Sequence, residues 1–74
     1  MFLGNIGQAR KDFFEEASLR CRKHARSNPA IERDQLRRLL RRWCESAVMV
    51  IPQSLAYQEI DRAVARHFQR TLER

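Results

Sequence analysis

The stretch LRRLLRRWCESAVMVI, residues 36–51, carries the pattern that decides the fold. Its apolar side chains recur every three or four residues, so at about 100° per residue they lie within one narrow arc of a helix. The opposite side is mostly arginine, which is typical of a helix with one buried and one exposed face. The apolar arc consists of Leu36, Leu39, Leu40, Trp43, Ala47, Val50 and Ile51. We therefore predict a helix over about residues 30–51.

Two further stretches show the same period. Residues 6–27 and residues 54–73 each place their apolar side chains on one side of a helix. Breaks that contain proline, at 27–29 and 51–54, separate the three stretches, and Ser54 is a candidate N-cap for the last one. The sequence therefore predicts an all-α fold of three amphipathic helices, arranged as a small antiparallel bundle or an extended helical hairpin.

The composition excludes several classes of protein. The 74 residues form one small domain over 1–74, since domains commonly run to about 100–150 residues. The chain is 43% apolar and 32% charged, which is too apolar for a disordered tail and too charged for a membrane span. Two glycines and two prolines are too few for the turns of a β-sandwich or barrel. The first residues, 1–4, lack the basic and long apolar regions of a signal peptide, so we expect a cytoplasmic protein with reduced cysteines.

Some apolar residues do not fit the three stripes. Val48 and Met49 lie on the polar side of the helix predicted over 30–51, and Leu19 lies opposite the apolar face of the first helix. A thin core of three helices cannot bury all of them. Isolated exposed apolar residues are common, but clusters of them usually mark an interface, and we favour the interface.

The basic residues form two rows. The net charge is +6, and thirteen of the fifteen basic residues are arginine, a residue suited to carboxylates and phosphates. The rows contain Arg37, Arg38, Arg41 and Arg42, and Arg62, Arg66, Arg70 and Arg74. Acidic residues are interspersed in both rows, which is typical of a solvated face. A row of arginines without acidic residues would suit a phosphate backbone. A bias of the genome toward arginine codons is a further explanation of the composition.

The cysteines and histidines suggest a metal or a reactive thiol, and we expect neither. Cys21, His24 and His67 fall at similar heights in an antiparallel bundle, but Cys44 lies about 10 Å further along the axis. It therefore cannot readily complete a zinc site. A thiol near imidazoles could begin a nucleophilic site, yet a third orienting group and a cleft are missing. Cys21 is better explained as a small apolar filler.

Two arginines contradict the apolar stripe of the first helix. Arg10 lies near the middle of that stripe and Arg20 at its edge. We expect them either to extend toward solvent at the helix ends or to reach a carboxylate on a neighbouring chain. The acidic residues Glu59 and Asp61 are interpreted as members of a solvated face.

These features predict a small basic interaction protein: an adaptor, assembly factor, accessory subunit or inhibitor. It would dock on a protein partner or on a second copy, without a cofactor, metal, small-molecule substrate or membrane, and without enzymatic activity of its own. The expected anchors are Leu19, Trp43, Val48 and Met49, rimmed by Arg37, Arg38, Arg41 and Arg42. The alternative is a regulator that binds nucleic acid through the arginine rows of the second and third helices. A thiol-dependent activity at Cys21 is a third possibility.

Overall fold

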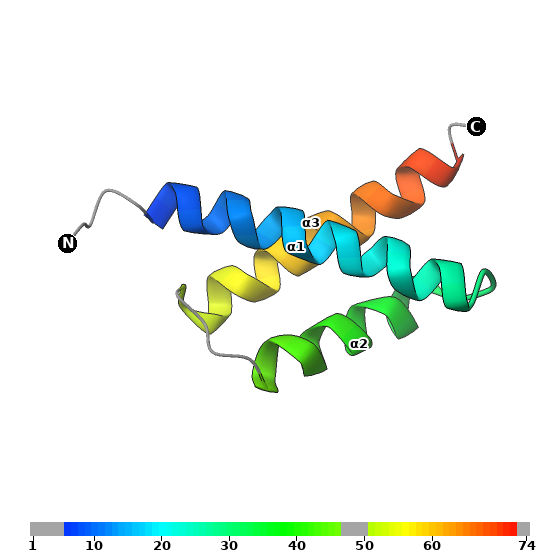
Figure 1. The fold of residues 1–74 in the computed structure, drawn as a ribbon, viewed down its shortest axis with the longest axis horizontal. Coiled ribbons are helices and arrows are strands. Elements are labelled where there is room, and N and C mark those ends of the chain that lie inside the picture. The colour runs from blue at the N-terminus through cyan, green and yellow to red at the C-terminus, as the bar shows by residue number, and fades with distance from the viewer. Residues whose placement is uncertain (1–5, 47–50, 73–74) are drawn as a thin grey trace.

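The computed structural model describes residues 6–46 and 51–72, and nearly all of them are helical. The helices are α1 (Ile6–Ser27), α2 (Arg33–Ser46) and α3 (Gln53–Leu72), as Figure 1 shows. The described ranges contain no strand. The predicted all-α fold of three amphipathic helices is confirmed, and the helices pack as a small bundle.

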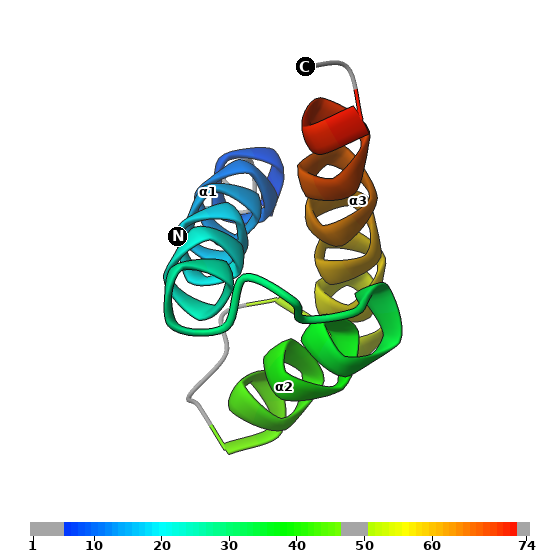
Figure 2. The same ribbon diagram turned by 90° about the vertical axis from the view of Figure 1, so that its right-hand side faces the viewer.

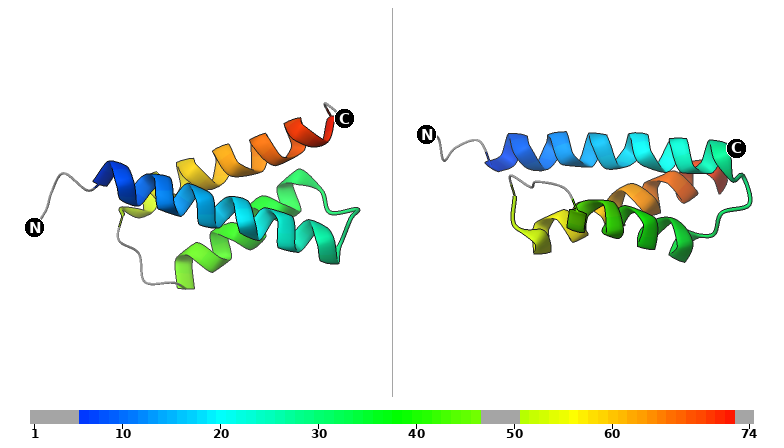
Figure 3. Two further views of the ribbon diagram at one scale, coloured as in Figure 1. Left: turned by 45° about the horizontal axis from the view of Figure 1, so that its top comes forward. Right: turned by 60° about the horizontal axis from the view of Figure 1, so that its bottom comes forward.

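The three helices do not contact one another equally. α1 packs most extensively on α3, α2 also packs on α3, and the α1–α2 seam is the sparsest of the three. Viewed nearly end on, the helices occupy the corners of a triangle, with α2 covering one side of the α1–α3 pair (Figure 2). The views in Figure 3 agree with this arrangement. The opposite side of the α1–α3 pair is therefore not covered by a third helix.

The first helix begins and ends where the sequence predicts. Its last turn is closed by the backbone N–H of Asn28, which donates to the carbonyl oxygen of His24 at 2.9 Å. The side-chain oxygen of Asn28 then accepts from the N–H of Ala30 at 3.2 Å. This local bond competes with helix continuation, which is why asparagine ends helices so readily.

The second helix starts later than predicted. The turn at 29–30 is not helical, and α2 begins only at Arg33. The side chain of Gln35 accepts from the backbone N–H of Glu32 at 2.9 Å, and the N–H of Leu36 donates to the carbonyl of Glu32. These bonds make Glu32 the N-cap, with Gln35 as the reciprocal arm of a capping box. The buried Ile31 precedes the cap and belongs to the same core cluster as Leu36, as in a hydrophobic staple.

The later boundaries also differ from the prediction. α2 is described as far as Ser46, and Ile51 lies in a bend, so the predicted extension of the helix to residue 51 is wrong there. α3 begins at Gln53, because the N–H of Ala56 donates to the carbonyl oxygen of Pro52 at 3.0 Å. Pro52 therefore takes the capping position. Ser54, the predicted cap, lies within the first turn and is exposed.

The core is built from the facing stripes of all three helices and from two residues in the loops. Small side chains on α1 (Ala17, Cys21) and α3 (Ala56, Ala63) allow these two helices to approach closely. Larger side chains of α2 and α3 fill the space between those helices. The buried apolar residues are Ala17, Cys21, Ile31, Leu36, Leu40, Cys44, Ile51, Ala56, Ile60, Ala63 and Val64.

We predict that Leu40→Ala lowers the free energy of unfolding by about 2–5 kcal/mol, because Leu40 is fully buried and its truncation leaves a cavity. Leu19→Ala removes the same atoms from a side chain that is 47% exposed. This substitution should change the free energy of unfolding by less than about 0.5 kcal/mol. Urea denaturation followed by circular dichroism measures both values. Equal losses in the two variants would contradict the described core.

Candidate functional site

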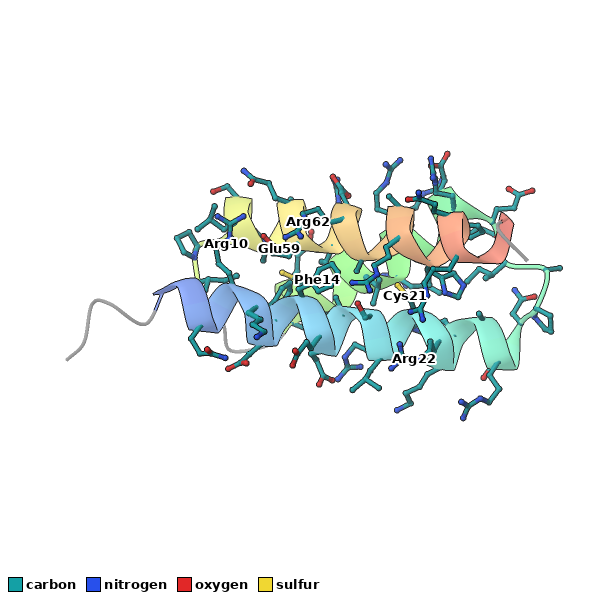
Figure 4. All side chains as sticks on the ribbon, turned by 90° about the horizontal axis from the view of Figure 1, so that it is seen from above. Arg10, Phe14, Cys21, Arg22, Glu59 and Arg62 are labelled. Carbon is teal, nitrogen blue, oxygen red and sulfur yellow. The ribbon has the colours of Figure 1, made fainter. Side chains whose placement is uncertain are left out.

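A buried carboxylate lies between α1 and α3. The side chain of Glu59, on α3, is 1% exposed. Its Oε2 accepts hydrogen bonds from Nε and Nη2 of Arg10, at 3.0 Å and 2.5 Å, and its Oε1 accepts from Nη1 of Arg62 at 2.6 Å. Figure 4 shows these three side chains together between the two helices. Because an ionised carboxylate is costly to bury alone, these charged donors are what make its burial possible.

This cluster corrects two expectations from the sequence. Glu59 does not belong to a solvated face, and Arg10 bonds a carboxylate of its own chain. The spacing along α3 indicates the burial of Glu59. It lies three residues after Ala56 and four before Ala63, which are both buried, so all three residues share one face of the helix. Arg10 lies on the apolar arc of α1, and Glu59 on the facing helix α3 supplies the carboxylate that it bonds.

The aromatic ring of Trp43 lies in the seam between α1 and α2. It stacks on Phe13 with ring centroids 5.2 Å apart, and the guanidinium of Arg20 lies 4.3 Å from the Trp43 ring. Arg20 also forms an ion pair with Glu16 on the same helix. Arg20 therefore stays on the α1–α2 seam, covering an aromatic ring, and Trp43 remains half-buried.

Two of the four arginines predicted to rim the interface form ion pairs with described residues of the chain, and the other two do not. Arg41 turns toward α3, where its Nη2 lies 3.3 Å from both carboxylate oxygens of Asp61 and its guanidinium covers Tyr57. Glu45, four residues after Arg41 on α2, accepts a hydrogen bond from the Tyr57 hydroxyl, so Arg41 pairs with a residue of α3 and not within its own helix.

Arg37 pairs with Asp34 of the same helix at 2.8 Å. Arg38 and Arg42 are exposed on the outer face of α2 and form no hydrogen bond or ion pair with the described residues. Their guanidinium groups are thus the ones of this row that remain open to a partner.

The predicted apolar anchors do not form one patch among the described residues. Leu19 is exposed, and it lies about 200° around α1 from Ala17 and from Cys21, which are both buried. It therefore points away from the core and lies on a different face from Trp43. Val48 and Met49 lie outside the described residues.

A groove lies between α1 and α3, and no described residue of α2 lines it. Its volume is about 590 Å³, and its lining residues are Phe14, Arg62, Ala65, Arg66, Gln69 and Arg70. The guanidinium carbons of Arg62 and Arg66 lie 4.9 Å and 5.9 Å from the centroid of the Phe14 ring. The arginine row of α3 thus faces α1, whereas Arg41 of the α2 row faces α3. The two rows do not form one continuous surface.

Both cysteines are buried and free. Burial raises the pKa of the Cys21 thiol to about 11, although the nearby Arg22 partly opposes the shift. Burial also raises the pKa of Cys44, and the charge of Glu45 adds to that rise. Because the thiolate is the nucleophile, both groups are poorly suited to covalent chemistry at neutral pH.

The two histidines are half-buried, and no metal-binding group of three or more His, Cys, Asp or Glu side chains occurs in the described parts of the chain. His67 meets the ring of Phe68 edge to face, with centroids 5.3 Å apart. Among residues 6–46 and 51–72, no helix combines the length and the apolar character that crossing a membrane requires. Comparison with protein-family models, with curated proteins and with solved structures found no match.

We predict that Glu59→Gln lowers the free energy of unfolding by about 1–3 kcal/mol, because two arginines lose a charged acceptor inside the protein. Asp61→Asn, on the same helix, is the matched control. It weakens only the half-exposed contact with Arg41 and should cost less than about 1 kcal/mol. Chemical denaturation of both variants tests this, and an equal effect of the two substitutions would contradict it.

We also predict that stability falls as the pH rises from about 9 to about 11. The folded protein holds the Cys21 proton up to a pKa of about 11, whereas the unfolded chain releases it near 9.0, so alkali favours unfolding. Cys21→Ala should reduce the loss of unfolding free energy over this pH range by about 2 kcal/mol. Urea denaturation at several pH values measures this difference. Because the pKa of Tyr57 and that of Cys44 are also raised, part of the fall should remain. Superimposable pH profiles for the two proteins would refute the prediction.

Proposed function

We propose that this chain is a small basic interaction protein, an adaptor or accessory subunit, that docks on an acidic surface of a protein partner. The observation that carries the proposal is the outer face of α2. There Arg38 and Arg42 lie one helical turn apart, are exposed and have no partner among the described residues. Side-chain charges left unpaired on one face favour a partner of opposite charge and speed its association.

The adjoining α1–α2 seam supports an apolar centre for the same surface. Packing between these helices is sparse, and Phe13, Leu39 and Trp43 remain half-buried along it. Tryptophan and arginine are the residue types that contribute most to binding energy at protein interfaces. In the proposal, Trp43 is the central anchor and the two arginines form its rim. Val48 and Met49, which follow in the sequence, remain proposed contacts.

Leu19 and Arg41, which the sequence predicts to be interface residues, contribute less in this proposal. Leu19 lies on the outer face of α1, and Arg41 is engaged by Asp61 and Tyr57. The chain acts by binding and not by catalysis in this account, and the raised pKa of Cys21 supports that choice over a thiol-dependent activity.

The proposal predicts that charge reversal on α2 abolishes capture of a protein partner. The protein is immobilised and exposed to nuclease-treated extract of its host, with Arg38→Glu combined with Arg42→Glu as the test variant. Lys23→Glu combined with Arg26→Glu is the matched control, because both residues are exposed on α1 and the change in net charge is the same.

We expect an acidic protein to be retained by the wild type and by the α1 variant, and to be lost from the α2 variant. Equal retention by both variants would contradict the proposed surface. Capture of nothing, or of a second copy of the chain alone, would contradict the proposed function.

The sequence-based alternative, binding of nucleic acid, has one specific observation in its favour. The arginine row of α3 lines a groove, whereas the row of α2 does not continue it. The groove lies between α1 and α3, away from the surface of α2 proposed to bind a protein.

A further inference from the structure

Three of the six residues that line the groove between α1 and α3 are arginine. Arg62, Arg66 and Arg70 follow one another at intervals of one helical turn, and none of the described residues that line the groove is acidic. The nearest acidic group in contact with the row is Glu59, which is buried and already bonded by Arg10 and Arg62. Arg66 and Arg70 form no ion pair with the described residues, so the groove keeps a positive charge that nothing in the described chain neutralises.

The spacing of the row suits a chain of regularly repeated anions. Side chains four residues apart on a helix have Cβ atoms about 6 Å apart, so neighbouring guanidinium groups can each contact a successive phosphate of a nucleic-acid strand. Arginine binds phosphate with two parallel hydrogen bonds, which also fixes the orientation of the strand.

The aromatic ring of Phe14, which lines the groove, is a second feature that suits a nucleic acid. Arg62 and Arg66 lie over the Phe14 ring at 4.9 Å and 5.9 Å, and this contact holds the two guanidinium groups in place. Unpaired bases stack on arginine guanidinium groups and on aromatic rings, and this groove holds both kinds of group close together. Figure 4 shows Phe14 lying between the helices beside Arg62.

We propose that the groove between α1 and α3, lined by Arg62 and Arg66 over Phe14 and by Arg70 one turn further along α3, binds a single-stranded nucleic acid. A single strand can enter a recess of about 590 Å³ and expose its bases there. A duplex presents stacked, paired bases and is read by an element that protrudes into its groove. An acidic peptide could pair with the arginines, but it has no bases to stack on their guanidinium groups.

This proposal goes beyond the docking function and does not depend on it. The groove is lined by described residues of α1 and α3 and by none of α2, whereas the proposed protein surface lies on α2. A chain with both surfaces could hold a nucleic-acid strand next to a protein partner.

The test measures fluorescence anisotropy of labelled oligo(dT) and oligo(U) with the full chain over a range of salt concentrations. Arg66→Gln combined with Arg70→Gln removes two charges from the groove and leaves Arg62 bonded to Glu59. Lys23→Gln combined with Arg26→Gln removes two charges from the exposed face of α1 and is the matched control. Circular dichroism verifies that each variant keeps its helices.

We expect the groove variant to bind about tenfold more weakly at low salt, and the slope of log K against log salt to become shallower by about 1.4, at about 0.7 per lost phosphate contact. The control variant should keep the wild-type slope. Equal weakening of the two variants would overturn the proposal. Competition by a duplex, or by poly-glutamate, as effective as that of an unlabelled single strand would also overturn it.

Discussion

The buried carboxylate of Glu59 constrains the structure more than any other single group. Its charge can stay in the interior only where donors reach both oxygens, and Arg10 on α1 and Arg62 on α3 supply them. Because Arg10 lies 49 residues away in the sequence, this one pair fixes the register of α1 along α3. The small side chains of both helices then pack in that register, and α2 covers one side of the α1–α3 pair.

The same register determines what lies on the uncovered face. Phe14 follows Arg10 by one helical turn, and Arg62 and Arg66 follow Glu59 along α3, so the ion pair places the ring beneath these two guanidinium groups. A shift of α1 by one helical turn along α3 would break the Arg10–Glu59 ion pair and remove the Phe14 ring from beneath the arginines. The feature that stabilises the α1–α3 pair is thus also the feature that shapes the candidate binding groove.

Periodicity in the sequence was enough to predict three helices, because apolar spacing depends only on neighbours within one helix. The start of α2 was missed because a proline near 29 suggested an earlier start, whereas the actual cap depends on Gln35 bonding back to Glu32. The pairing of Arg10 with Glu59 could not be derived from one helix alone, since it depends on how two helices face each other. The same reason explains Arg41: a helical wheel places it on the polar side, but Asp61 and Tyr57 of α3 draw it inward.

The most direct test of the register is the solvent exchange of the Arg10 Nε proton, observed by NMR in ¹⁵N-labelled protein. If Arg10 donates to the buried carboxylate, this proton should exchange slowly and show nuclear Overhauser contacts to protons of α3. The Nε protons of the exposed Arg38 and Arg42 should exchange rapidly under the same conditions. An Arg10 Nε proton that exchanges as fast as theirs, without contacts to α3, would contradict the account.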